Sequence, residues 1–214
     1  MNKKTAGLSF IGNVIIGFGI SILNLSGLGL DAFTAMNYGV SQVLGVGLGI
    51  YQACFNLILL IPIAVFYRRA LGVGTLINMF LLGYFVEIFM QIFALFQLVP
   101  AVFDTLIIKL ILLAIGFVIC NFGAALYMEC QCGMGIYDCY APFIEDKTHI
   151  PFQYARIATD FICAMIGFIA GQQAHVTTIG VATVIFVMGT GPMVQLFRSR
   201  IMKPFLQKLR KGEE

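Results

Sequence analysis

The chain has 214 residues, of which 60% are hydrophobic and only 11% are charged, and its mean hydropathy is +0.95. A soluble domain usually carries about a quarter charged residues. This chain therefore lacks the polar surface that water requires, and lipid must surround much of it. Its net charge of +3 is small, which excludes the dense basic face of a nucleic-acid-binding protein.

Six stretches are long and apolar enough to cross a bilayer, for which about twenty mostly apolar residues are needed. The first follows a basic start, Met-Asn-Lys-Lys, but lacks a clear cleavage site, so it is interpreted as a spanning helix rather than a secretory signal. We therefore expect an all-α polytopic membrane protein surrounded by the lipid bilayer. The predicted spans are 7–25, 46–66, 74–96, 105–127, 155–172 and 177–197.

The basic residues predict the orientation of the spans. Lys3 and Lys4 precede the first span, and Arg68 and Arg69 follow the second. The segments 26–45, 97–104 and 173–176 contain no Lys or Arg. Because cytoplasmic segments carry the excess of positive charge, both termini are expected in the cytoplasm. The remaining basic residues that support this orientation are Lys147, Arg156, Arg198, Arg200, Lys203, Lys208, Arg210 and Lys211.

The second half of the chain resembles the first. Residues 71–89 align with 179–197 without a gap, and seven of the nineteen positions are identical, including Gly72/Gly180, Thr75/Thr183 and Gly83/Gly191. Shorter matches place 27–33 over 133–139, which pairs Gly27 with Gly133 and Gly29 with Gly135, and place 51–53 over 152–154.

Each half contains three spans, and an odd number makes the second half enter the membrane from the opposite face. This pattern predicts a 3+3 inverted-topology repeat with glycine-broken helices, as in many secondary transporters. The predicted units are a first three-helix repeat at 1–103, a second at 104–198, and a basic amphipathic cytoplasmic tail at 199–214. Such a tail is expected to lie along the anionic inner leaflet.

Each repeat contains one Gly-x-Gly loop with an aspartate close behind, in Ser-Gly-Leu-Gly-Leu-Asp-Ala-Phe and Cys-Gly-Met-Gly-Ile-Tyr-Asp-Cys. Irregular backbone at membrane depth is tolerated only when buried in protein or lining a wet cavity. We therefore expect the two loops to approach each other from opposite faces around a central polar site. The predicted substrate-binding residues are Asn24, Gly27, Gly29, Asp31, Glu129, Gly133, Gly135, Asp138, Arg156 and Asp160.

Several of these residues have a structural alternative. Asp31 and Asp138 could instead cap the helices that follow them. Arg156 and Asp160 are four residues apart and can pair on one helix face, either as a structural ion pair or as a gate whose partner changes. Glu129 is included because it directly precedes the second loop, although a polar group in a span often serves only to join helices.

The cysteines favour packing over chemistry. Cys130, Cys132 and Cys139 cluster near Met134, a combination that could hold Cu(I). Their spacing is not that of a zinc site, however, and the first repeat has no counterpart. We expect no metal and no cofactor.

Four motifs resemble those of the YczE/YyaS/YitT-like bacterial integral membrane proteins. They are Gly-Leu-Gly-Leu-Asp-Ala-Phe (27–33), Gly-Val-Gly-Thr-Leu-Ile-Asn (72–78), Ala-Arg-x-x-x-Asp (155–160) and Gly-Pro-Met-Val-Gln-Leu-Phe (191–197). The resemblance implies a bacterial cytoplasmic membrane location and this architecture, without implying a substrate. The second loop of that family often reads Gly-x-Gly-Pro-Arg-Asp, whereas residues 133–138 here keep the aspartate and lack the arginine.

These features favour a small secondary transporter or permease for an unidentified small solute or ion, with a homo-oligomer as a possible assembly. Two alternatives stay open. A solute-binding subunit of a multi-component importer would copurify with an ATPase pair, and a non-transporting accessory protein supporting export or biosynthesis would hold a stable partner. An enzyme is not expected, because no recognisable nucleophile–base motif occurs.

Overall fold

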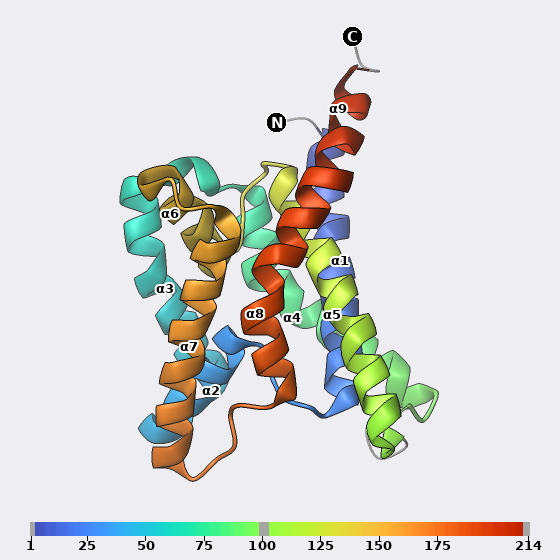
Figure 1. Ribbon diagram of the computed structural model, residues 1–214, viewed down its shortest axis with the longest axis vertical. Coiled ribbons are helices and arrows are strands. Elements are labelled where there is room, and N and C mark those ends of the chain that lie inside the picture. Colours follow the sequence, from blue (N-terminus) through green and yellow to red (C-terminus); the bar gives the residue numbers. More distant parts are fainter. Residues whose placement is uncertain (1–2, 99–102, 212–214) are drawn as a thin grey trace.

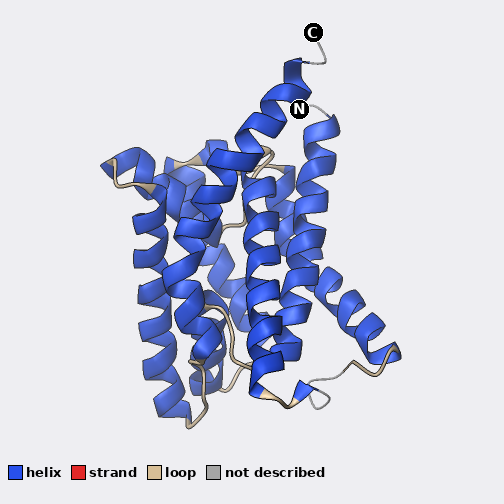
Figure 2. Ribbon diagram, turned by 45° about the vertical axis from the view of Figure 1, so that its right-hand side comes forward, coloured by secondary structure: helices blue, strands red, loops and turns tan. Residues whose placement is uncertain are grey.

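The computed structural model describes residues 3–98 and 103–211, which form helices joined by loops without any strand (Figure 2). Six of the helices are long and apolar enough to cross a membrane. This result confirms the all-α class and the six predicted spans. The six helices are α1 (Lys3–Ser26), α3 (Leu48–Phe66), α4 (Val73–Leu95), α5 (Leu106–Glu129), α7 (Phe152–Ala174) and α8 (Val181–Phe197).

Short helical elements lie between and after the spans. The helix α2 (Ala32–Leu44) has 13 residues and α6 (Tyr140–Thr148) has 9, so both are too short to cross a bilayer. The other elements are the 3₁₀ turns η1 (Arg68–Ala70) and η3 (Tyr137–Cys139), the π-helical η4 (Arg198–Met202) and α9 (Lys203–Lys211). The last two continue α8, so that one apolar helical stretch runs from Val181 to Leu209.

The start of α1 and the end of α9 lie at the same end of the molecule (Figure 1). Two other basic segments, η1 and the end of α6, lie toward this end, which we call the basic end. The loop after α1 and the loop between α7 and α8 lie at the opposite end.

The helices α1 and α5 pack against each other at one side of the bundle (Figure 1). Glycines allow their backbones to approach closely, as small residues do between membrane helices. A Cβ atom on Gly123 would lie 2.8 Å from the Gly12 carbonyl oxygen, and one on Gly116 would lie 3.0 Å from the Gly19 carbonyl oxygen. The seven-residue spacing of these glycines repeats the contact after two helical turns.

A second glycine contact joins α2 to α7. A Cβ atom on Gly39 would lie 2.9 Å from the Gly167 carbonyl oxygen, and one on Gly167 would lie 2.9 Å from the Met36 backbone nitrogen. The helix α4 packs against α1, and α8 packs against both α5 and α7. The first turn of α2 lies inside the bundle, because the Gly39–Gly167 contact holds α2 against α7. There the Phe33 ring stacks on Tyr137.

The two Gly-x-Gly loops bond in the same manner to the starts of two spans. The Ala182 N–H of α8 donates to the Leu28 carbonyl at 3.1 Å, and the Gly74 N–H of α4 donates to the Cys132 carbonyl at 2.7 Å. The first turns match as well, because the Gly180 N–H bonds the Thr183 hydroxyl at 3.2 Å and the Gly72 N–H bonds the Thr75 hydroxyl at 3.1 Å.

Glycine is required at one position in each loop. Gly29 has a φ of +118° and packs on Gly180, whereas Gly133 has a φ of +106° and packs on Gly72. These conformations are open to glycine and strained for other residues. Gly29 and Gly133 are therefore the residues that correspond in space. The pairing of Gly27 with Gly133 was wrong by two residues, because a short alignment between loops does not fix its register.

We expect Gly29→Ala and Gly133→Ala each to lower the free energy of unfolding by about 1–3 kcal/mol, because alanine is strained at these φ angles. Gly7→Ala is the matched control. Gly7 lies within α1 in open space, so its replacement should leave stability unchanged or raise it by up to about 1 kcal/mol. Unfolding in detergent would measure the difference. Equal effects at Gly7 and Gly29 would contradict this account of the loops.

Candidate functional site

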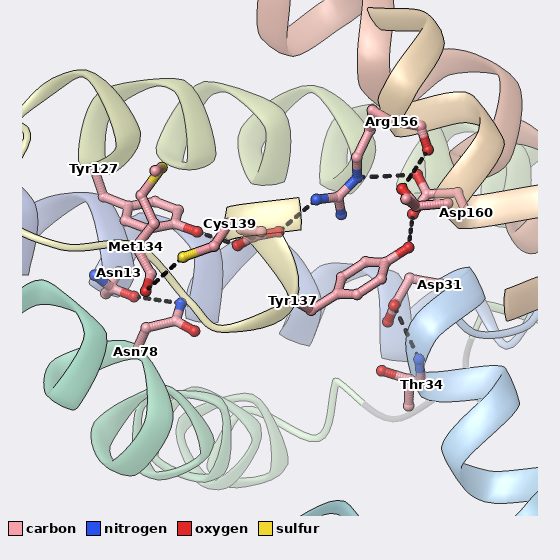
Figure 3. A network of polar contacts seen from close by, with 12 residues as sticks. Asn13, Asp31, Thr34, Asn78, Tyr127, Met134, Tyr137, Cys139, Arg156 and Asp160 are labelled. Carbon is pink, nitrogen blue, oxygen red and sulfur yellow. Dashed lines mark hydrogen bonds and ion pairs between the residues drawn. The ribbon is translucent and has the colours of Figure 1, made fainter. Parts of the chain in front are cut away.

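A buried ion-pair network lies where the second Gly-x-Gly loop meets α7 (Figure 3). Arg156 Nη1 is 2.6 Å from Asp138 Oδ1, and Arg156 Nε is 3.1 Å from Asp160 Oδ2. The side chains of Arg156 and Asp160 are 14% and 5% exposed. The predicted pair on one face of α7 is thus present, and η3 adds a second carboxylate to it.

Two tyrosines complete the network. The Tyr137 hydroxyl donates to Asp160 Oδ1 at 2.5 Å, and the Tyr127 hydroxyl of α5 donates to Asp138 Oδ2. The guanidinium of Arg156 also lies 4.7 Å from the centre of the Tyr137 ring. Each aspartate therefore has both a cationic and a neutral donor, which is how a buried charge is stabilised in an apolar interior.

The first Gly-x-Gly loop reaches the same place through α2. The Phe33 ring stacks on Tyr137 with 4.3 Å between ring centres and 15° between planes. Asp31 lies beside Tyr137 (Figure 3), close enough to Asp160 for the two charges to interact. The Thr34 N–H donates to Asp31 Oδ1 at 3.1 Å, so Asp31 caps α2.

The two predicted aspartates consequently have different roles. Asp31 is a helix cap, whereas Asp138 is an ion-pair partner inside η3 and caps neither η3 nor α6. The capping alternative thus holds for Asp31 and fails for Asp138. Gly135 packs against this site, since a Cβ atom there would lie 3.2 Å from Asp138 Oδ2.

An amide pair continues the polar chain toward α1 and α4. Asn78 Nδ2 donates to Asn13 Oδ1 at 2.8 Å (Figure 3), and Asn13 Nδ2 donates to the Ser9 carbonyl at 2.9 Å. Asn78 also lies against Gly135. Residues of α1, α2, α4, α5, η3 and α7 therefore meet at one polar region.

Several predicted site residues lie elsewhere. Gly27 is exposed with no described atom within 4 Å of an added Cβ, and Gly29 and Gly133 contact the starts of α8 and α4. Asn24 is exposed on α1 and makes no side-chain hydrogen bond with the described residues.

Glu129 Oε2 is 3.1 Å from Arg198 Nε, and Arg198 lies 5.2 Å from the Phe152 ring centre. Glu129 thus joins α5, α7 and the end of α8 at the basic end. Its place next to the second loop in sequence gave no information on the direction of its side chain.

Sequence reasoning did not single out Tyr127 and Tyr137. A signal for them existed, because a tyrosine hydroxyl within an apolar segment needs a hydrogen-bond partner. Tyr137 also directly precedes Asp138, at the position where the resembled family often has arginine.

The cysteines do not converge. Cys130 and Cys132 pack in one hydrophobic cluster, whereas Cys139 packs in another with Ile63 and Ala70. Among the described residues, no group of three or more His, Cys, Asp or Glu side chains is placed to hold a metal ion. The cysteine side chains serve as small apolar groups in the core.

The charge balance decides what the central region can do chemically. Among the described residues, Asp31, Asp138 and Asp160 lie near one cation, Arg156, so the ionised cluster has more negative than positive charge. Two of the carboxylates bond hydroxyl groups. A cluster of this kind can take up a proton or a small cation, whereas an anion would first have to displace an aspartate from Arg156.

We expect Arg156→Leu to lower the free energy of unfolding by about 3–5 kcal/mol, because it leaves the buried Asp160 and the half-buried Asp138 without their cation. Arg156→Leu with Asp160→Leu should recover only part of this loss, since Asp138 stays unpaired. Denaturant titration of the detergent-purified protein would measure both. Asp104→Asn is the control, because the exposed Asp104–Lys109 pair should contribute at most about 1 kcal/mol. Full recovery in the double variant would exclude a contribution from Asp138.

Comparison with known proteins supports the membrane assignment. The chain is 27% identical over 203 residues to an uncharacterized protein of Haemophilus influenzae, which covers 94% of this chain and 86% of the relative. It is 28% identical to the uncharacterized protein YyaS of Bacillus subtilis, with 94% and 96% covered. The uncharacterized membrane protein YczE of the same organism is 27% identical over 148 residues, which cover 69% of this chain and 66% of YczE.

No solved structure matches the chain. Residues 3–199 match a family described as "Family of unknown function (DUF6198)". This match covers all six spans and both Gly-x-Gly loops, and the YyaS and YczE relatives agree with the resemblance found in the motifs. The chain therefore belongs to this family of YczE/YyaS-like membrane proteins of unknown function.

Proposed function

We propose that this protein is a small secondary transporter or permease, and that its substrate site is the buried region around Arg156, Asp138, Asp160 and Asp31. The observation that carries the proposal is the meeting of two interrupted segments, one from each half of the chain, at a buried ionisable cluster. Ionisable groups inside membrane proteins occur mainly on ion or substrate pathways.

The proposal includes an inverted repeat of two three-span halves. Its support is the matched bonding of the loops: Leu28 to Ala182 and Cys132 to Gly74, with a threonine capping the same turn of α4 and α8. Two short helices, α2 and α6, follow these loops in equivalent places. Secondary transporters with inverted repeats place their substrate between such discontinuous helices.

The proposed location is the bacterial cytoplasmic membrane, with the basic end in the cytoplasm. Support comes from the arginines of η1 and η4 and from Lys147, which lie in segments toward one end of the molecule (Figure 1). Positive residues favour the cytoplasmic side of bacterial membrane proteins.

The transported species is proposed to be a small cation, a proton, or a solute coupled to one of them. The three aspartates exceed the single arginine in charge, and such an excess inside a membrane protein is stabilised when a cation or proton is bound. In this scheme Arg156 is the gate residue, because its guanidinium is shared by carboxylates on η3 and α7 and can favour either one.

Flux measurements on purified protein in liposomes test the transport proposal. A pH-sensitive dye and a cation-sensitive dye inside the vesicles would report proton and Na⁺ or K⁺ movement under an imposed gradient. Protein-dependent flux is the expected result. Absence of flux, together with a stable membrane or ATPase partner on purification from cells, would favour the accessory or importer-subunit alternative instead.

We expect Asp31→Asn to abolish this flux while leaving the fold intact. Asparagine caps a helix about as well as aspartate, so the substitution removes the charge without removing the cap. The matched control is Asp104→Asn, which removes a carboxylate that is 90% exposed and bonds Lys109 at 2.9 Å. Flux and thermal unfolding would be measured on the same preparations. Normal flux in Asp31→Asn would remove Asp31 from the site.

A further inference from the structure

The two halves differ in how their last two spans pack on each other. In the second half, α7 packs against α8, and Gly191 lies on the backbone of Gln153, so that an added Cβ would be 3.1 Å from the Gln153 Cα. In the first half, α3 and α4 occupy the equivalent places but lack comparable packing. No described atom lies within 4 Å of a Cβ added to Gly83, the residue aligned with Gly191.

The burial of the spans gives the same result. In the most apolar 18-residue window of each span, 33% of the residues are buried in α7 and in the span containing α8. The values are 6% for α3 and 0% for α4. Two helices of one half therefore stand open to their surroundings, while their counterparts are packed.

The exposed face of α4 carries polar residues that are unfavourable in contact with lipid. Residues of α4 such as Phe85 and Phe89 face α1, where they contact Phe10 and Phe18. Helical periodicity places Gly83, Glu87 and Gln91 on the side away from α1, and Glu87 and Gln91 are exposed. A carboxylate within a spanning helix is unfavourable against lipid. This face is better suited to contact with another helix than to permanent exposure.

The open and packed contacts lie at opposite ends. Gln153 is in the first turn of α7, which begins toward the basic end, and η1 joins α3 to α4 at that end (Figure 1). Gln52, aligned with Gln153, is in the first turns of α3, which begins at the opposite end. The second half is thus packed at the basic end, where Arg198 also joins Glu129 and Phe152, whereas α3 and α4 lack the matching contact toward the other end.

We propose that these two contacts exchange. In the second conformation the start of α3 packs through Gln52 on Gly83 of α4, and the start of α7 leaves Gly191, so that the central site opens to the basic end. The helices α1 and α5, held together by their glycines, stay fixed. This inference rests on the proposed function, because it describes how access to the same site would alternate between the two sides.

Disulfide trapping tests the first half of the exchange. The parent carries Cys54→Ser, because Cys54 is exposed. In lipid nanodiscs under mild oxidation, Gln52→Cys with Gly83→Cys should form an intramolecular disulfide, since oxidation accumulates even a rare conformation. Gln52→Cys with Leu76→Cys is the matched control, because Leu76 lies on the same side of α4 two turns nearer the basic end. It should form none. Failure of the first pair to crosslink, with both thiols reactive, would overturn the proposal.

Thiol labelling at the basic end tests the coupling. Val194 of α8 is 2% exposed and packs in one cluster with Phe152 and Ala155 of α7. A water-soluble maleimide should label Val194→Cys faster when the Gln52→Cys/Gly83→Cys disulfide is formed than in the Val194→Cys variant of the parent without that disulfide. Gly83→Leu fills the free space on α4, so it should lower the labelling rate of Val194→Cys. An unchanged rate in both would overturn the exchange.

The outcomes separate this inference from the proposed function. Coupled crosslinking and labelling without any flux in liposomes would remove transport and leave the conformational exchange. Flux without coupling between the two ends would remove the exchange and leave transport.

Discussion

The structure depends on satisfying the backbone of two interrupted segments inside a bundle that lipid surrounds. A peptide group without a partner at membrane depth is strongly unfavourable. Here the carbonyls of Leu28 and Cys132 accept from the first turns of α8 and α4. Gly29 and Gly133 make this possible, because their positive φ turns each loop and their missing side chains allow contact with Gly180 and Gly72. The helices α2 and η3 can then begin in the interior, which brings Phe33 onto Tyr137.

The central ion pairs follow from that arrangement. Asp138 reaches Arg156 because η3 starts beside α7, and Tyr127 of α5 closes the other side of the carboxylate. Asp160, Tyr137 and Asp31 complete a cluster in which carboxylates outnumber cations. A purely structural ion pair needs only one carboxylate for one guanidinium. The shared Arg156 and the surplus of negative charge are what favour a proposed role in binding a cation or proton.

The difference in helix packing between the two halves suggests how access to the central cluster would alternate between the two sides of the membrane. The pair α1 and α5 packs closely through glycines at two levels. Outside this pair, α7 and α8 are in contact at Gly191, whereas Gly83 of α4 has no described neighbour on its open side. If the halves descend from one unit, α3 can pack on α4 at Gly83 as α7 packs on α8 at Gly191. Forming these two contacts in turn would expose the central cluster to one side of the membrane and then to the other.

The six spans and the Arg156–Asp160 pair could be predicted from the residues alone, because hydropathy and helical spacing depend on residues near each other in the chain. Both glycine loops could be located in the same way. The correspondence of Gly133 with Gly29, the cap formed by Asp31 and the binding of Asp138 to Arg156 are evident only in the folded bundle. The folded bundle likewise places Glu129 at Arg198, away from the centre, and brings Tyr127 to Asp138. These outcomes depend on the rotation and depth at which distant helices pack, and no short stretch of sequence encodes either quantity.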